Sequence, residues 1–340
     1  MRDGTPAGKV WTRGKWVLGV GISAVLLWLA CREVSWTGFV AGLGRADPLR
    51  LASGVLLCIA VYVMFALRWK LILGPLVEVS VVECFDFIMI GHLVDTVLPL
   101  RAGDIGRAAL LGSSKQKDAA TIFASVVVER ILDILALLVL AGIVLPSLPR
   151  AQMLVWAVQG IVAVAAAAVL VAVLILRFQR VLPLLERAIG RMLPRRLARV
   201  LLDAVNGFAD GLVAVRQSPH PVRVLALSLG AWAAVCASTL LYLHAFHLHL
   251  PWYGACFVVL MVNLGSAVPS SPGFIGVYHF LVVTALATWV PSKDLRMSYA
   301  VAAHAIGILT IIGLGGTALV RRQLRLSSIL HRRERHNDDA

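Results

Sequence analysis

Long stretches of hydrophobic residues that contain no charged side chain alternate with short polar and basic segments along this chain. Most of these stretches approach or exceed the roughly 20 residues that a helix needs to cross the hydrocarbon core of a bilayer. Because lipid offers backbone N–H and C=O groups no hydrogen-bond partner, such segments are expected to be helices. The uncharged stretches are Trp16–Cys31, Leu51–Leu67, Ile134–Pro149, Ala151–Leu176, Val224–Leu243, Trp252–Ser292 and Ser298–Val320.

The pattern predicts an all-α, polytopic membrane protein with about six full spans and two helical hairpins. Segments 84–112 and 252–290 are apolar but are interrupted in the middle by Pro and Gly. Each is interpreted as a re-entrant or broken hairpin. The alternative is two full spans, but halves of about 15 residues are short for a crossing. The full spans are expected at 16–31, 51–67, 119–145, 151–176, 223–243 and 298–320.

One short motif occurs in each hairpin. Residues 99–106 and residues 269–276 share the pattern Pro-x-x-x-Gly-x-Ile-Gly. Hydrophobic segments that are broken by Gly and Pro at matching places in two halves of a chain indicate the central site of a transporter. Coincidence between two loops rich in Gly and Pro is the alternative interpretation.

The net charge of +14 is concentrated just outside the apolar stretches. This positive-inside pattern predicts an inner-membrane protein with both termini in the cytoplasm. In that orientation 25 Lys and Arg residues fall in cytoplasmic segments and 6 in external ones. No nucleic-acid fold motif accompanies the basic residues, so attraction to anionic lipid head groups is favoured over nucleic-acid binding. The end of the second span, Arg68-Trp69-Lys70, is interpreted as a basic and aromatic anchor at the membrane surface.

The same orientation makes the two halves of the chain inverted copies, with the first hairpin open to the cytoplasm and the second open to the outside. The predicted organisation is a basic cytoplasmic N-terminus, one transmembrane domain with a basic cytoplasmic connector in its middle, and a basic cytoplasmic tail. The corresponding ranges are 1–15, 16–320 (halves 16–176 and 223–320, connector 177–222) and 321–340.

Arg101 and Arg107 flank Gly103 in the first break. An arginine at membrane depth costs about 2.5–3.5 kcal/mol to insert, so each is expected to face a cavity or a partner. A guanidinium can donate two parallel hydrogen bonds to a phosphate, and a helix that opens after Gly103 would point N–H groups at an anion. Gly103 and Gly106 would let a head group approach the backbone. The sequence predicts a phosphate-binding break; an interfacial positive anchor is the alternative.

The third predicted span carries Glu129-Arg130-x-x-Asp133 on one helical face. Arg130 can pair with either carboxylate, which reduces the cost of burying these charges. The cluster keeps one net negative charge, which could pair with an arginine of the first break. A purely structural ion-pair cluster is the alternative. Asp95 and Asp104 are weaker candidates for the same network.

The second break carries no charge, but its hydroxyls and freed backbone groups suit sugars, phosphate oxygens or water. Asn263 and His279 flank it as weaker candidates, and a histidine in an apolar stretch is more often a hydrogen-bonded core residue. No metal site and no cofactor are expected, since the chain has no nucleotide-binding motif and its histidines lack nearby carboxylates. The residues of the break considered for substrate binding are Pro269, Ser270, Ser271, Gly273 and Gly276.

Three segments in this order, Leu98–Arg107, Glu129–Asp133 and Ser271–Val277, resemble the lysylphosphatidylglycerol synthase transmembrane-region family of flippase-like proteins. The resemblance covers roughly residues 15–325. It implies movement of lipids between leaflets, as in the flippase half of the multiple peptide resistance factor. It also implies links to polyprenyl-phosphate sugars, glycolipids or hopanoids.

Two departures from the family pattern matter. No soluble aminoacyl-transfer domain is recognised, so synthesis of lysyl-lipid is not expected. Tyr278 and His279 stand where family members often have an acidic residue, which argues against ion coupling through a carboxylate at that place.

The expected function is therefore translocation of a lipid with a phosphate-bearing or polar head group, without an enzymatic step. Arg101, Arg107 and Arg130 would hold the anion, while Glu129 and Asp133 would orient them or bind a cationic head group. The expected partners are membrane lipids, with a second copy of the chain or lipid-synthesis enzymes as further candidates.

Two alternatives come from other functional classes. One is a glycosyl-transfer enzyme that uses a polyprenyl-phosphate donor, with Asp95 or Asp104 as its base. The other is a non-catalytic membrane subunit of a lipid or glycolipid synthesis pathway.

Overall fold

The computed structural model describes residues 6–97, 102–148, 220–265 and 270–324. These residues form helices and short connections, and no strand occurs among them, which confirms the predicted all-α class. The chain divides into two compact units, each built from segments that are far apart in sequence. Unit 1 comprises residues 1–60, 85–107 and 234–340, and unit 2 comprises residues 61–84 and 108–233.

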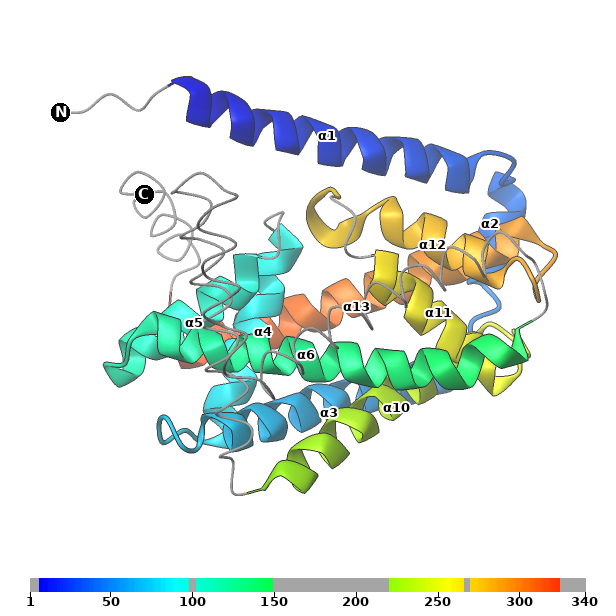
Figure 1. The fold of residues 1–340 in the computed structure, drawn as a ribbon. Coiled ribbons are helices and arrows are strands. Elements are labelled where there is room, and N and C mark those ends of the chain that lie inside the picture. The colour runs from blue at the N-terminus through cyan, green and yellow to red at the C-terminus, as the bar shows by residue number, and fades with distance from the viewer. Residues whose placement is uncertain (1–5, 98–101, 149–219, 266–269, 325–340) are drawn as a thin grey trace. The chain divides into compact units, whose positions relative to one another are not determined.

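Several helices contribute to both units. Figure 1 labels the helices along the chain. The described elements are α1 Pro6–Cys31, α2 Trp36–Leu43, α3 Pro48–Leu73, α4 Val81–Val97, α5 Ala102–Lys115, α6 Ala119–Val144, η1 Leu145–Ser147, α10 Pro221–Ala245, α11 Trp252–Gly265, η2 Pro272–Phe274, α12 Val277–Leu286 and α13 Lys293–Arg321. Unit 1 contains α1, α2, α11, η2, α12 and α13 with parts of α3, α4, α5 and α10, and unit 2 contains α6 and η1 with the remaining parts of those four helices.

In unit 1, the short helix α2 is bonded to the beginning of α13. α1 and α2 meet at an angle of 89°. Ser35, the N-cap of α2, donates from its backbone N–H and from its hydroxyl to the two oxygens of Asp294, at 2.8 Å and 2.6 Å. The hydroxyl of Ser298 donates to the carbonyl oxygen of Phe39 at 2.8 Å. The segment between the predicted spans 16–31 and 51–67 therefore contains a helix that is tied to α13.

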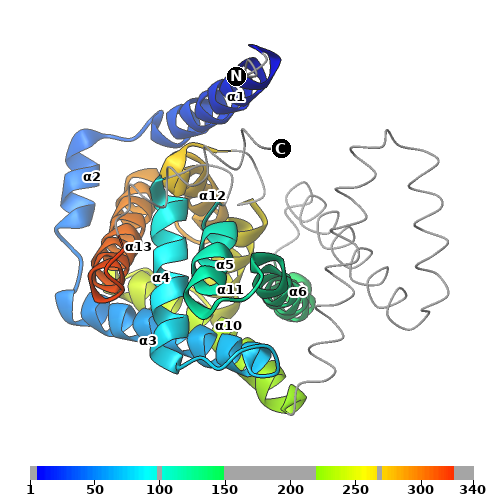
Figure 2. The same ribbon diagram turned by 90° about the vertical axis from the view of Figure 1, so that its left-hand side faces the viewer.

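Glycines let α4 approach its neighbours closely in unit 1, where α13, α4 and α5 lie side by side (Figure 2). A Cβ atom on Gly103 would collide with the carbonyl oxygen of Gly91. On the α13 side, a Cβ on Gly315 would lie only 2.9 Å from the carbonyl oxygen of Met89. The small residues at these crossings are therefore required by helix packing.

The C-terminal end of α13 is held to α4 by a buried carboxylate. Asp86 is 0% exposed and accepts from Arg321 at 2.7 Å and from Arg322 at 2.8 Å. The guanidinium of Arg322 also lies 5.6 Å from the centre of the Phe87 ring. Cations suit the negative end of the α13 dipole, and the pairing compensates the cost of burying Asp86.

Unit 2 is organised around α6, which begins at the N-cap Asp118. Its buried face packs against α3 and α10 through a small apolar core. The indole N–H of Trp69 donates to the hydroxyl of Ser125 at 2.9 Å, which satisfies the polar atom of a side chain that is 0% exposed. The core residues are Ile72, Val128, Leu132 and Val224.

The start of α4 and the end of α5 are joined in unit 2 by Glu83. Ser80 and Glu83 form a capping box, with reciprocal bonds of 2.8 Å and 3.1 Å between backbone N–H groups and side-chain oxygens. Lys115 lies 2.8 Å from the same carboxylate. Partial burial alone would raise the pKa of Glu83, but the bonds to Lys115 and Ser80 outweigh it, and the pKa is lowered.

The helix boundaries agree well with the hydrophobic pattern. α3, α10 and α13 are long and apolar enough to cross a membrane, and α1 with α2 would add one bent span. α6 follows the predicted span 119–145 within a residue but contains three charged side chains. The predicted span 151–176 and most of the connector 177–222 lie outside the described residues.

Both predicted breaks occur. α4 ends at Val97 and α5 begins at Ala102, while η2 stands between α11 and α12. Residues 98–101 and 266–269, which include Arg101 and Pro269, lie outside the described part of the chain. The first helix after the break continues to Lys115, three residues further than the predicted hairpin.

Gly103 and Gly106 of the same motif provide a matched pair of substitutions. Gly103→Ala is expected to destabilise the protein by about 1–3 kcal/mol, because the new methyl group would overlap the Gly91 carbonyl. Gly106→Ala meets no atom within 4 Å and should be neutral or stabilising by up to about 1 kcal/mol through helix propensity. Thermal melting of the purified variants in one detergent measures the difference. Equal melting temperatures would contradict the close crossing of α4 and α5.

Candidate functional site

The N-terminus of α5, at the first break, is occupied by a carboxylate. The N–H of Gly103 donates to Oδ1 of Asp95 on α4 at 2.7 Å. This bond satisfies one of the N–H groups that a helix start leaves without an intrahelical partner, and the negative charge suits the helix dipole. The anion predicted for this helix start is thus provided, in this structure, by a side chain of the protein itself.

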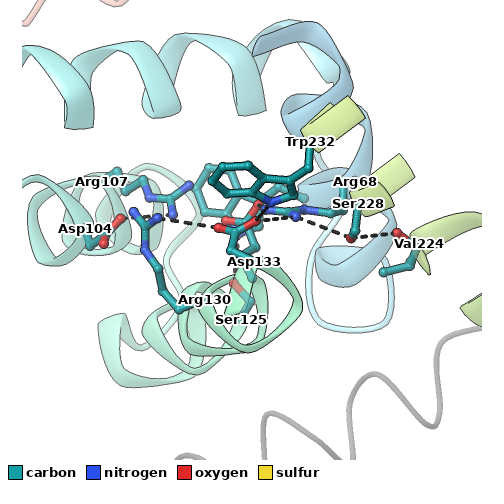
Figure 3. A network of polar contacts seen from close by, with 11 residues as sticks. Arg68, Asp104, Arg107, Ser125, Arg130, Asp133, Val224, Ser228 and Trp232 are labelled. Atoms are coloured by element: carbon teal, nitrogen blue, oxygen red, sulfur yellow. Dashed lines mark hydrogen bonds and ion pairs between the residues drawn. The ribbon is translucent and has the colours of Figure 1, made fainter. Parts of the chain in front are cut away.

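Arg107 lies in the second turn of α5 and is 6% exposed. It donates to Oδ1 of Asp104 at 3.1 Å, an i,i+3 pair labelled in Figure 3. Its stem packs against α4, since a Cβ on Gly91 would lie 3.3 Å from Cδ of Arg107. Asp104, a weaker candidate in the sequence, is therefore a direct partner of Arg107. Arg101 lies outside the described residues.

The second break is shaped by two glycines with positive φ, Gly273 at 66° and Gly276 at 93°. Residues with a Cβ avoid this region, and at Gly276 a Cβ would also collide with the carbonyl oxygen of Ser23. The N–H of Ser271 donates to the hydroxyl of Ser23 at 2.7 Å, and the hydroxyl of Ser271 donates to the Ile275 carbonyl at 2.9 Å. α1 therefore supplies partners for backbone that is not helical.

Two imidazoles hold the same break. Nδ1 of His279 accepts from the N–H of Gly276 at 3.3 Å, and His279 is 7% exposed. His304 on α13 hydrogen-bonds to the backbone of Gly273. The ring centres of His279 and His304 are 5.0 Å apart.

The remaining predicted residues of the second break have local roles. The amide of Asn263 donates to the Val259 carbonyl at 2.9 Å, one turn earlier on α11. The backbone of Ser270 lies beside α1, because a Cβ on Gly19 would be 3.2 Å from the Ser270 carbonyl oxygen. Pro269 lies outside the described residues.

The two breaks lie next to each other within unit 1. A Cβ on Gly273 would lie 3.6 Å from the carbonyl oxygen of Thr96, in the last turn of α4. The second copy of the Pro/Gly motif therefore lies against the end of α4, three residues before the first copy begins. We call this place the double break, and its residues are Asp95, Thr96, Gly103, Asp104, Arg107, Ser271, Gly273, Gly276, His279 and His304.

A second polar centre lies in unit 2, where Arg68 of α3 meets two carboxylates of α6 (Figure 3). Its guanidinium lies 2.7 Å from Oδ1 of Asp133 and 3.3 Å from Oε1 of Glu129. Arg68 and Glu129 are each 2% exposed, and Asp133 is 8% exposed. Removing such charges from water is costly unless they are paired and hydrogen-bonded, as they are here.

Neutral groups of α10 complete this centre. The hydroxyl of Ser228 accepts from Arg68 at 3.3 Å, and the indole N–H of Trp232 donates to Asp133 at 3.2 Å. The Arg68 guanidinium also lies 4.9 Å from the centre of the Phe65 ring. The network joins α3, α6 and α10 into one packed group.

The sequence interpretation of Arg68 as a surface anchor is wrong, because Arg68 is 2% and Trp69 is 0% exposed. Arg130, the predicted partner of the carboxylates, lies 3.5 Å from Asp133, but its side chain is 40% exposed. The principal counter-charge of the cluster is therefore Arg68. Arg68 and Arg130 together balance the two carboxylates, so Arg68 compensates the net negative charge that the sequence predicted for the cluster.

Sequence reasoning missed Arg68, His304 and Asp86 as members of polar contacts. A signal existed for Arg68, because two carboxylates in an otherwise apolar helix require a buried cation. His304 stands alone in a long apolar helix and gives no hint of a partner. Among the described residues, no group of three His, Cys, Asp or Glu side chains is arranged to hold a metal ion.

Comparison with known proteins gives two matches. Residues 16–315 match the family described as "Lysylphosphatidylglycerol synthase TM region". The chain is also 25% identical over 340 aligned residues to the protein named "Glycosyltransferase AglD" of Haloferax volcanii. That alignment covers 89% of this chain and 54% of the relative, so the chain spans about half of the relative's length. No solved structure matches the chain.

Arg68 and Arg130 carry the same charge but differ in burial, which makes them a test of the network. Arg68→Gln is expected to destabilise the protein by about 3–5 kcal/mol, because it leaves two buried carboxylates without their main counter-charge. Arg130→Gln should cost no more than about 1 kcal/mol, because its side chain is 40% exposed. Thermal melting in detergent ranks the two variants.

A triple change tests the same network from the other side. Arg68→Met combined with Glu129→Gln and Asp133→Asn removes all three buried charges and should melt at a higher temperature than Arg68→Gln. Equal losses in Arg68→Gln and Arg130→Gln would refute Arg68 as the centre of the network.

Proposed function

We propose that this chain, which belongs to the lysylphosphatidylglycerol synthase transmembrane-region family, moves lipids with a phosphate-bearing or otherwise polar head group between leaflets. The observation that carries the proposal is the meeting of the two breaks at Thr96 and Gly273. Non-helical backbone at membrane depth is tolerated where it is buried in protein or lines a polar path. A polar head group needs such a path, whereas the acyl chains can stay in lipid.

The chemistry of the double break suits an anionic head group. Asp95 at the N-terminus of α5 marks a position where an oxyanion accepts an N–H bond, and phosphate oxygens have the same requirement. Arg107, together with Arg101 as predicted from the sequence, would supply positive charge. In this proposal a lipid phosphate exchanges with Asp95 at Gly103 while Arg107 donates to the phosphate.

The network in unit 2 has a supporting role in this proposal. Glu129 and Asp133 pair mainly with Arg68, and the resulting network holds α3, α6 and α10 together. Arg130 is the member whose partly exposed side chain can also contact a head group.

Glycosyl transfer from a polyprenyl-phosphate donor is the second candidate, and the printed name of the archaeal relative favours it. Such an enzyme needs a carboxylate that can act as a base in an accessible site. Asp95 and Asp104, the two predicted bases, are engaged by Gly103 and Arg107 respectively. These contacts favour lipid movement over group transfer.

Arg107 tests the transport function directly. In liposomes that contain purified protein and a fluorescent NBD-labelled phosphatidylglycerol, dithionite added outside bleaches only the outer leaflet. Arg107→Gln is expected to lower the rate of lipid movement by about 10–100-fold, because it removes one hydrogen bond between the guanidinium and the charged phosphate. Arg107→Lys should restore part of the rate, because a point charge lacks the bidentate fork.

Lys117→Gln, at an exposed position in the turn after α5, is the matched control and should move lipid like the wild type. A normal rate in Arg107→Gln would exclude a phosphate site at the double break. Conversion of a polyprenyl-phosphate sugar without movement of the labelled lipid would support the second candidate.

The proposal includes an inverted repeat in an inner membrane, with both termini in the cytoplasm. Hairpin 84–112 would then open to the cytoplasm and hairpin 252–290 to the outside. Ser113 and Pro291, both exposed, lie at the corresponding ends of these hairpins. In a background without the five native cysteines, Pro291→Cys should react with a membrane-impermeant thiol reagent in intact cells. Ser113→Cys should react only after the cells are opened, and labelling of both from one side would contradict the inverted repeat.

A further inference from the structure

In the second break, one imidazole contacts the backbone of each of the two glycines with positive φ, Gly273 and Gly276. His279 accepts from the N–H of Gly276, and His304 bonds to the backbone of Gly273. For Nδ1 of His279 to accept a hydrogen bond, it must carry a lone pair, so His279 is neutral with its proton on Nε2. The conformation described here is therefore the one that belongs to unprotonated His279.

Protonation of His279 would change this arrangement. A proton added to the imidazole goes to Nδ1, and the nitrogen that accepted from Gly276 becomes a donor. Two N–H groups then face each other, so the bond to Gly276 is lost. Because the rings of His279 and His304 are 5.0 Å apart, two positive charges would repel, and the pair takes up one proton in preference to two.

The groups around the pair come from several helices, and α4 and α5 bring the charged residues Asp95, Asp104 and Arg107 of the double break. Tyr278 stacks on His304 with ring centres 4.4 Å apart, and Tyr242 and Tyr299 are neighbours of Tyr278. Arg296 reaches α12 at the Val283 carbonyl, 2.9 Å away and one turn beyond His279. α11 and the part of α1 from Gly19 to Cys31 contain no charged residue. The charged residues of α13 lie in its first and last turns and are Lys293, Asp294, Arg296 and Arg321.

We propose that His279 and His304 form a one-proton site, and that a proton bound there releases Gly276 and opens the second break. Imidazole is the side chain that most readily gains and loses a proton near neutral pH, so these two rings are the groups of the second break best suited to carry one. Because Gly273 of this break lies against Thr96 of the first, a change at Gly276 is passed directly to the double break. Given the proposed function, on which this step rests, the proton is the ion coupled to lipid movement.

The proton site can be tested without any transport. The full chain, labelled with ¹³C-histidine and placed in lipid nanodiscs, is titrated by NMR between pH of about 5 and 8, the range in which imidazoles change charge. The resonances of the pair are assigned by their loss in His279→Asn and His304→Gln. Asn at position 279 keeps an acceptor for the Gly276 N–H but cannot be protonated. We expect the two resonances to titrate together, and each single variant to change the titration of the remaining imidazole.

His249→Asn is the matched control. His249 is exposed and pairs with His244 at 5.6 Å between ring centres, away from either break. This variant also removes an imidazole from a histidine pair, but it should leave the titration of His279 and His304 unchanged. If neither His279 nor His304 titrates in this range, the proton site does not exist.

Coupling is tested in the same liposomes with NBD-labelled phosphatidylglycerol. With one proton per lipid, a gradient of one pH unit should shift the steady-state ratio of lipid between leaflets by up to about tenfold. The shift should persist in His249→Asn and vanish in His279→Asn and in His304→Gln. If the ratio of lipid between leaflets in the wild type does not change with the pH gradient, proton coupling is refuted. Absence of lipid movement under every condition would overturn the proposed function, while the NMR titration decides the proton site independently.

Discussion

A helix that is broken inside a membrane releases backbone groups that lipid cannot satisfy, and much of unit 1 is arranged to meet that constraint. Asp95 accepts a hydrogen bond from the N–H of Gly103. Ser23 accepts one from Ser271, and His279 accepts one from Gly276. Each acceptor is a polar side chain of a helix that is mostly apolar. Such residues are costly in a membrane, so their presence beside the breaks indicates that the breaks themselves are needed.

The Arg68 network and the double break differ in structure and in the role that each can have. Arg68 and Arg130 balance the charges of Glu129 and Asp133, and Arg68 and both carboxylates are buried. Hydrogen bonds to Ser228 and Trp232 join this network to α10. Such a network favours one packed arrangement of its helices. The double break combines glycines with single hydrogen bonds between backbone N–H groups and side chains, and in the proposed function a lipid head group would replace such a side chain.

The sequence predicted the helices well because lipid imposes a simple rule on them. α6 and α10 begin and end within about two residues of the predicted limits, since the length of an apolar stretch determines a span. The two breaks were equally visible, because Pro and Gly interrupt apolar runs at Pro99–Gly106 and Pro269–Gly276.

Pairing of polar side chains across helices was less predictable. The sequence placed Arg68 at the membrane surface because it follows an apolar run, as an anchor would. Its burial depends on α6 being adjacent, and periodicity along one helix contains no information about its neighbour. The same holds for His304, whose role becomes visible only when α13 lies beside Gly273. The ion pair Arg107–Asp104 is local, and its i,i+3 spacing could have been read from the sequence.

α13 is fastened at both ends, by Asp294 to Ser35 and by Arg321 and Arg322 to Asp86. Its 29 residues extend about 43 Å, which exceeds the roughly 30 Å of a typical hydrocarbon core. A helix of this length fits such a layer only by tilting or by projecting its ends among the head groups. Because both ends are bonded to other helices of unit 1, α13 can change its tilt only together with those helices, which links the tilt of unit 1 to the thickness of the host membrane.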